Sequence, residues 1–155
     1  MEKKKNAISY ESIMKDLKAR KFAPVYVLMG DEPFYIDKIC DYIAENVLQP
    51  EERDFNQTVL FGADTTAVQV VDQCKGYPMM AEFRVVIVKE AQNLKSLDAL
   101  EKYLEKPVKS TILVICNKNG SIDRRKKFIP RAEQVGVVFE SKKLYDRQLP
   151  GFIET

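Results

Sequence analysis

The residues with the strongest claim to chemistry form a short loop, Gly30-Asp31-Glu32-Pro33, directly after the apolar run at 25–29. In a parallel α/β sheet, ligands bind at the carboxyl ends of strands, which is where this loop would lie. A phosphate-cradling loop needs several glycines, whose amides approach the phosphate oxygens, followed by Lys-Ser or Lys-Thr. This loop has one glycine, two carboxylates that would repel phosphate, and a proline without an amide hydrogen. It therefore argues against ATP, GTP or dinucleotide binding, and Asp31 is better explained as the cap of the next helix.

Other candidate catalytic or metal-binding groups are sparse. The chain has no histidine, the commonest general base and metal ligand. Lys89 and Glu90 follow a predicted strand at the place where nucleotide hydrolases carry an acidic pair. A basic residue with one glutamate after it is more typical of solvated charges. Asp31, Glu32 and Asp37 match no metal-binding loop, and no serine, cysteine or lysine has an evident activating base. The sequence therefore predicts no catalytic residue, no metal site and no cofactor.

The bulk properties are those of one soluble domain. The 155 residues suffice for a hydrophobic core, and 45% hydrophobic with 31% charged residues is ordinary. The net charge of +2 neither demands nor excludes a polyanionic partner. Apolar runs are far shorter than the roughly 20 residues that span a bilayer, and no secretory signal is visible. The widely spaced Cys40, Cys74 and Cys116 fit reduced thiols, so we expect a cytoplasmic protein without membrane contact.

Apolar periodicity predicts helices that alternate with strands. Helices are expected after the caps Ser9, Asp31 and Asp64, around Leu97 to Leu104, and from Asp123 onward. Gly76 is expected to end the third helix in a left-handed conformation. Buried strands are expected at 25–29, 55–61, 83–88, 111–116 and 135–140. This alternation is typical of an α/β fold, and it predicts a five-stranded parallel sheet with helices on both faces.

Two further features could bind a partner. Arg124, Arg125, Lys126 and Lys127 form a basic cluster in the helix expected from Asp123. It could contact phosphate, although a charge run on a helix is usually its solvated face. The segment Tyr77-Pro78-Met79-Met80 precedes the third strand, and methionine suits an adaptable apolar contact. From the residues alone, packing of both methionines in the core is favoured over a binding role.

Three stretches resemble the delta subunit family of bacterial DNA polymerase III, part of the sliding-clamp loader. They are residues 24–36, 78–88 and 123–127, of which the first two are specific in combination. The resemblance spans about residues 9–151 and points to the N-terminal domain of the family. It implies a three-layer AAA+-like module whose phosphate loop, Gly30 to Pro33, is degenerate. This agrees with the loop chemistry, which was inferred separately.

The resemblance also implies a role in DNA replication. Family members grip the ring-shaped clamp through two adjacent hydrophobic residues before the third strand. By position these are Met79 and Met80, flanked by Pro78 and Tyr77, although the family commonly has an aromatic residue in place of Met80. The subunit would hold the clamp open without hydrolysing ATP, as a non-catalytic part of a nucleotidyltransferase holoenzyme. The implied partners are the sliding clamp, the other loader subunits, and DNA through the assembled complex.

Family members are about twice as long as this chain. We therefore expect a frayed terminus at 1–8, the clamp-binding domain at 9–140, and a linker at 141–155 toward C-terminal domains absent from this sequence. Such a module should bind a clamp but not assemble a loader. Two alternatives stay open at this point. One is an active AAA+ ATPase, and the other is a DNA-binding module that uses the basic cluster at 124–127.

Overall fold

The sheet predicted from the alternating pattern is present in the computed structural model, which describes residues 8–142. Five parallel strands pair in the order β2-β3-β4-β1-β5. They are β1 (Val25–Gly30), β2 (Gln57–Phe61), β3 (Arg84–Lys89), β4 (Thr111–Lys118) and β5 (Val137–Ser141). The fold class is thus confirmed. Of the terminus expected at 1–8 and the linker expected at 141–155, residues 1–7 and 143–155 fall outside the described residues, and Ser141 belongs to β5.

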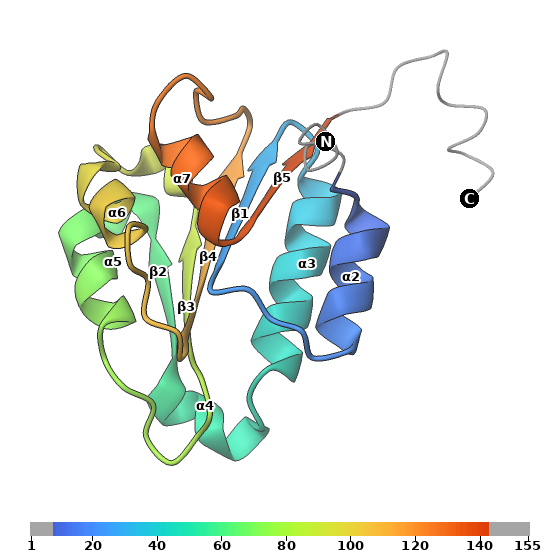
Figure 1. Cartoon of the computed structure of the whole chain (residues 1–155), viewed down its shortest axis with the longest axis vertical. Helices are drawn as coiled ribbons and strands as arrows, with labels where there is room; N and C mark the ends of the chain where they lie inside the picture. Colours follow the sequence, from blue (N-terminus) through green and yellow to red (C-terminus); the bar gives the residue numbers. More distant parts are fainter. Residues whose placement is uncertain (1–7, 143–155) are drawn as a thin grey trace.

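Helices cover both faces of the sheet and make three layers (Figure 1). On one face lie α2 (Tyr10–Lys18) and α3 (Pro33–Asn46), which bury Leu17 and Ile39 against the sheet. On the other lie α5 (Ala67–Cys74), α6 (Asp98–Tyr103) and α7 (Phe128–Val135), with Leu100 and Phe128 in the core. The short helix α4 (Pro50–Asn56) lies at the lower end of the view, beside the loop that leads into β3. Single 3₁₀ turns occur at η1 (Gly62–Asp64) and η2 (Ala91–Asn93).

The central strands are buried on both faces, as their unbroken apolar runs predict. In β3, Val85 and Ile87 contact the core under α3, whereas Val86 and Val88 contact the core under α5 and α6. All four side chains are inaccessible to solvent. Burying such a side chain is worth roughly 1.5–3 kcal/mol, so these strands contribute heavily to the stability of the domain. No helix among the described residues is long and apolar enough to cross a membrane.

The second predicted strand begins two residues late, because a helix occupies its expected start. Pro50 is the first residue of α4, where its missing amide hydrogen costs no helical hydrogen bond. Glu52 accepts a hydrogen bond from the amide of Gln49 at 2.9 Å, which caps the same turn. Phe55, predicted to be in a strand, therefore lies in the last turn of α4.

The third predicted helix also begins later than expected. Asp64 lies in η1, and the cap of α5 is Thr66, which forms a reciprocal pair with Gln69. The Gly76 prediction is wrong as well. Gly76 has no positive φ, and the left-handed residue of this region is Met80, at φ 56°.

We expect the domain to lose stability at alkaline pH, because two titratable groups are buried in its core. Cys74 and Tyr103 are buried together, and burial raises the pKa of each group to about 12 from 9.0 and 10.0 respectively. The unfolded chain releases both protons near the ordinary values, whereas the folded chain retains them, so rising pH favours unfolding. We expect the free energy of unfolding, measured with urea, to fall from about pH 9 up to about pH 12. Cys74→Ala should make this fall shallower, and an unchanged slope in that variant would contradict the assignment.

Candidate functional site

Two backbone amides of the degenerate phosphate loop, Gly30 to Pro33, form hydrogen bonds within the protein. Gly30 donates its amide hydrogen to the carbonyl of Gly120 at 2.9 Å, and Glu32 donates to the carbonyl of Ser141 at 3.3 Å. The cap of α3 is Glu32 rather than the predicted Asp31, since its carboxylate accepts from the amide of Phe34 at 3.1 Å. Pro33 explains the difference, because it is the first helical residue and makes its immediate predecessor the cap. Amides that would serve a phosphate are therefore engaged within the protein.

Polar side chains at the same edge of the sheet also pair with one another. Lys118, at the end of β4, forms an ion pair with Asp37 of α3 at 2.8 Å, and the hydrogen bond raises the pKa of Lys118. Glu90 accepts from the Gln92 amide at 2.8 Å, and Gln92 in turn accepts from the backbone of Lys118 at 3.0 Å. Within residues 8–142 there is no group of three acidic, cysteine or histidine side chains that could hold a metal ion. At this edge, Lys118 and Asp37 neutralise each other, and Gln92 links Glu90 to the end of β4.

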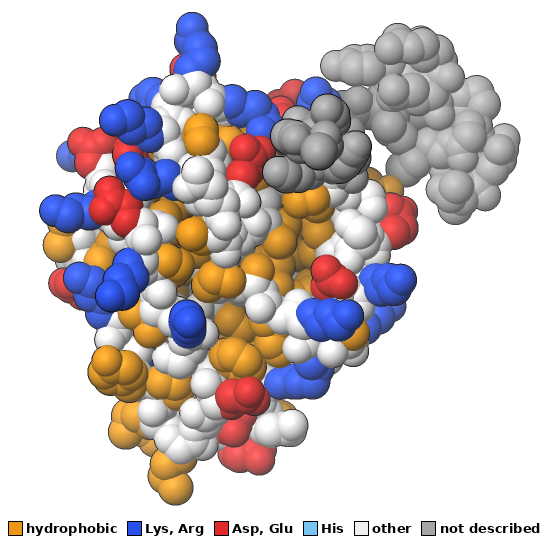
Figure 2. Space-filling view, viewed as in Figure 1, with side chains coloured by type: hydrophobic (Ala, Val, Ile, Leu, Met, Phe, Trp, Pro, Cys, Tyr) orange, Lys and Arg blue, Asp and Glu red, His pale blue; other side chains and the backbone are white. Residues whose placement is uncertain are grey.

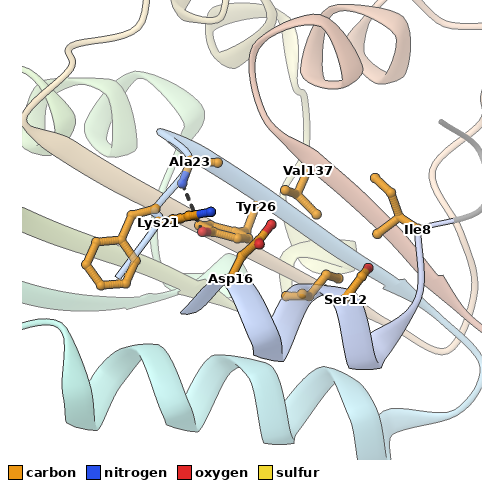
Figure 3. Close-up of a pocket in the computed structure, with 9 residues that line it drawn as sticks. Ile8, Ser12, Asp16, Lys21, Ala23, Tyr26 and Val137 are labelled. Carbon is orange, nitrogen blue, oxygen red and sulfur yellow. Dashed lines mark hydrogen bonds between the residues drawn. The ribbon is translucent and has the colours of Figure 1, made fainter. Parts of the chain in front are cut away.

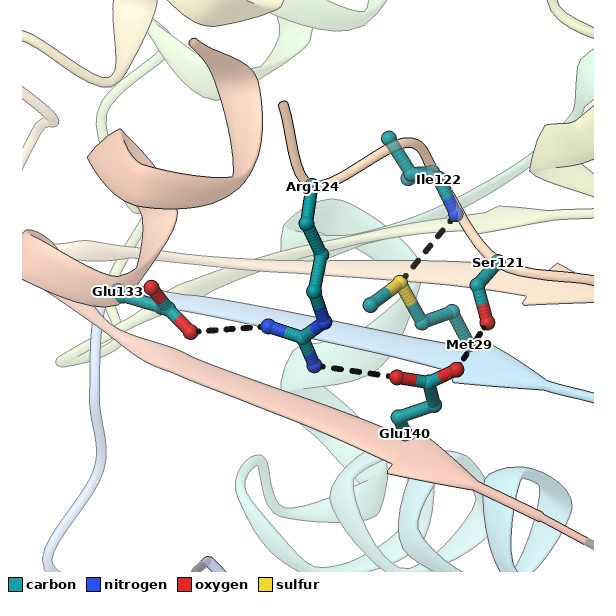
Figure 4. A network of polar contacts seen from close by, with 6 residues as sticks. All are labelled: Met29, Ser121, Ile122, Arg124, Glu133 and Glu140. Atoms are coloured by element: carbon teal, nitrogen blue, oxygen red, sulfur yellow. Dashed lines mark hydrogen bonds and ion pairs between the residues drawn. The ribbon is translucent and has the colours of Figure 1, made fainter. Parts of the chain in front are cut away.

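The basic cluster is not helical, which corrects the sequence prediction. Residues 124–127 form a turn, and α7 begins only at Phe128. Pro130 explains this start, because proline is tolerated in the first turn of a helix but not in its interior. Two of the four cations are also committed. Arg124 lies between Glu133 at 3.1 Å and Glu140 at 3.2 Å (Figure 4), and Arg125 pairs with Asp123 at 3.0 Å.

Only a small part of the basic cluster could contact a phosphate. Lys126 and Lys127 are exposed, but Arg124 serves to tie the turn to β5 and α7. Glu140 also accepts from the Ser121 hydroxyl at 2.6 Å, and its pKa is lowered by the hydrogen bonds from Ser121 and Arg124, against the opposing effect of burial. The main role of the turn is therefore structural, because Arg124 links it to α7 and β5.

A small pocket beside α2 has little chemistry to offer (Figure 3). Its volume is about 290 Å³, and it is lined by Ile8, Ser12, Ile13, Asp16, Lys21, Phe22, Ala23, Tyr26 and Val137. The Tyr26 hydroxyl at its floor accepts a hydrogen bond from the Ala23 amide at 2.9 Å. Burial raises the pKa of Tyr26, so its phenol stays protonated at neutral pH. Its clearest role is to pin the turn that precedes β1.

The two most exposed large apolar side chains, Met80 and Tyr77, lie at the opposite edge of the sheet, in the loop between α5 and β3. We call residues 75–83 the methionine loop. Met80 is 100% exposed, Tyr77 78% and Met79 59%, so core packing of the two methionines, favoured from the residues alone, is wrong. Phe55 of the neighbouring α4 is 66% exposed as well. Hydrophobic side chains gather at this lower end of the molecule (Figure 2). Exposed apolar clusters of this kind mark interaction sites.

The methionine loop is anchored at both ends although its centre is exposed. Arg84, which follows the loop, donates to the carbonyl of Gln73 at 2.8 Å and to the Gln73 side chain at 2.7 Å. Phe83 packs edge-on against Phe22, with ring centroids 5.4 Å apart. In the middle, the Asn56 side chain accepts from the amide of Met79 at 2.6 Å and donates to its carbonyl at 3.0 Å.

Sequence reasoning located Tyr77, Pro78, Met79 and Met80 but missed their neighbours. Phe55 was assigned to a strand, and nothing in the local pattern singles out Asn56, which lies 23 residues from its partner Met79. The structure brings the four predicted residues and these two together at one edge. It keeps this group apart from the loop at Gly30–Pro33 and from the basic turn, which lie at the other edge (Figure 1).

Comparison with known proteins identifies the family. The family model described as DNA polymerase III, delta subunit, matches residues 26–142. DNA polymerase III subunit delta of Bacillus subtilis (strain 168) is 27% identical over 150 residues, which cover 90% of this chain and 43% of that protein. The solved structure of the Bacillus subtilis DNA clamp loader delta protein superimposes with a TM-score of 0.82 at 26% identity, over 93% of this chain and 45% of that one.

A more distant likeness concerns the fold alone. A DNA polymerase III gamma subunit-related protein from Thermotoga maritima matches with a TM-score of 0.54 at 17% identity, over 95% of this chain and 49% of that one. Together with the delta structure it supports the AAA+-like α/β module predicted above. The chain spans less than half the length of these relatives. Because the family model matches most of the described domain, the chain belongs to the delta subunit family of DNA polymerase III.

Proposed function

We propose that this chain acts in DNA replication by binding the sliding clamp through the methionine loop. The observation that carries the proposal is the complete exposure of Met80, next to a half-exposed Met79, in a member of the delta subunit family. Exposed apolar side chains are stabilised when they are removed from water, and a pocket on a partner would bury Met79 and Met80 in this way.

The loop has the properties of an anchor. Its ends are fixed by Arg84 and Phe83, so little backbone freedom is lost when a partner binds. Methionine has an unbranched, polarizable side chain that adapts to irregular pockets. Buried anchors of this type commonly contribute about 2 kcal/mol or more each, and the surrounding contacts mainly exclude water.

We infer that the loop promotes clamp opening by binding the open ring more tightly than the closed ring. A ligand shifts a conformational equilibrium only by the difference between its affinities for the two states. The chain itself would not hydrolyse ATP, which other loader subunits would bind in the cytoplasm. Support for this comes from Gly30 and Glu32, whose amides already donate within the protein, and from the two carboxylates of the same loop.

The test is a calorimetric titration of this chain with its cognate clamp in two forms, the closed ring and a variant whose ring interface cannot form. We expect binding to both, with the higher affinity for the clamp that cannot close. Binding to neither form would refute clamp binding, and equal affinities would refute a role in opening. Titration with ATP and magnesium, run in parallel, should give no binding and no phosphate release. Measurable hydrolysis would instead favour an ATPase.

A further inference from the structure

We propose that Asn56 is the positioning residue that presents Met79 and Met80 to their partner. The identity of the partner rests on the proposed function, whereas the effect of Asn56 on the conformation of the loop does not. Asn56 is the last residue of α4 and is 1% exposed, although its side chain is polar. A buried carboxamide is stable only when its donor and acceptor are both paired, so the identity of its partners reveals what it holds.

Both polar atoms of the Asn56 side chain are satisfied, and two of the three bonds go to one residue. The oxygen accepts from the Met79 amide at 2.6 Å, and the nitrogen donates to the Met79 carbonyl at 3.0 Å. The nitrogen also donates to the carbonyl of Glu52, one turn back in α4, at 2.9 Å. The carboxamide thus binds Met79 as a neighbouring strand would, through both of its backbone groups.

This contact accounts for the conformation of the residue that follows. Met80 has φ 56°, a left-handed conformation that a non-glycine residue adopts only when its surroundings impose it. On one side Asn56 fixes Met79, and on the other Ala81 and Phe83 pack toward the core beneath α3. The single residue between these two attachments is therefore forced outward, with its side chain fully exposed.

Asn56 acts only through the backbone of Met79, so its loss should loosen the loop without disturbing the sheet. In Asn56→Ala, we expect hydrogen exchange of the Met79 amide to rise at least about tenfold, with exchange in β1, β3 and β4 unchanged. Clamp affinity should fall about tenfold, as expected from two lost hydrogen bonds and a disordered anchor. Asn56→Asp has the same size and still offers an acceptor to the Met79 amide, but it lacks the donor to the Met79 carbonyl. It is the second variant if the alanine variant folds poorly, and clamp affinity should fall in it as well, with a smaller rise in exchange at the Met79 amide.

The matched control is Asn46→Ala. Asn46 donates to the carbonyl of Tyr42 at 2.9 Å, the same one-turn bond that Asn56 makes to Glu52, but it has no bond to the loop. This variant should leave both exchange and clamp affinity unchanged.

A double-mutant cycle separates positioning from a general structural role. In the background of Met79→Ala/Met80→Ala, the effect of Asn56→Ala on affinity should vanish, because there is no longer an anchor to position. An undiminished effect in that background, or unchanged exchange of the Met79 amide, would overturn the inference. If the Met79 amide responds but the wild-type chain binds no clamp, Asn56 still positions the loop and the proposed function is the part that fails.

Discussion

Replacing Met79 and Met80 together by alanine should weaken clamp binding by far more than the roughly 30-fold expected for one anchor, because two side chains that the clamp would bury are removed at once. The free energy of unfolding should change by less than about 0.5 kcal/mol, since both side chains face water in the free domain. Affinity is measured by calorimetry, and folding by urea denaturation of the same samples.

The matched control for this pair is Phe34→Ala. Phe34 is 52% exposed, close to the 59% of Met79, but it lies in the first turn of α3 at the opposite edge of the sheet. Its removal should leave clamp affinity unchanged. A loss of affinity in Phe34→Ala equal to that of the methionine pair would indicate general apolar adhesion. A double variant that unfolds would show that the methionines stabilise the domain.

Gly30→Ala should destabilise the domain by about 3 kcal/mol or more, through two separate causes. Gly30 has φ 129°, a backbone conformation that residues with a side chain rarely adopt. A Cβ atom there would also lie 2.0 Å from the carbonyl oxygen of Ser141, at the end of the neighbouring β5. The glycine left in this loop is thus explained by the packing of β1 against β5, with no need for a phosphate. Urea denaturation measures the effect.

Gly120→Ala separates the two causes. Gly120 has a similar φ of 136°, but a Cβ atom there would have nothing within 4 Å. Gly120→Ala should lower the free energy of unfolding only through backbone strain, by about 1–2 kcal/mol. The difference between the two variants therefore measures the cost of the clash with Ser141. Equal losses in the two variants would mean that β5 moves away easily and that Gly30 is not required for packing.

The sheet could be predicted because its central strands carry unbroken runs of β-branched residues. Such a run, as at Val85–Val88, has the same meaning wherever it occurs: both faces must be covered. The edges of elements were harder to predict. In the segment of Phe55, a strand-like pattern competed with the helix start signals of Pro50 and Glu52, and the helix signals prevailed.

The candidate site was only partly accessible from the sequence. From the residues alone, core packing of the adjacent methionines is favoured, and this is wrong. Their exposure depends on whether a helix covers the segment, which no local sequence pattern shows. The resemblance to the family singled out Met79 and Met80. It did not reveal Asn56, whose role exists only once α4 and the loop are brought together. The basic turn shows the reverse, since Arg124 looks available in the sequence but is committed to Glu133 and Glu140.

Clamp contact by the methionine loop is tested most directly by photo-crosslinking with a diazirine analogue of methionine. Four of the five methionines lie in the described residues and provide their own controls, since Met29 is fully buried, Met14 is half-buried, and Met79 and Met80 are exposed in the loop. After irradiation of the complex with the clamp, mass spectrometry should find crosslinks from Met79 and Met80 and none from Met14 or Met29. A stable complex whose crosslinks arise elsewhere, with none from the methionine loop, would contradict its role as the clamp anchor.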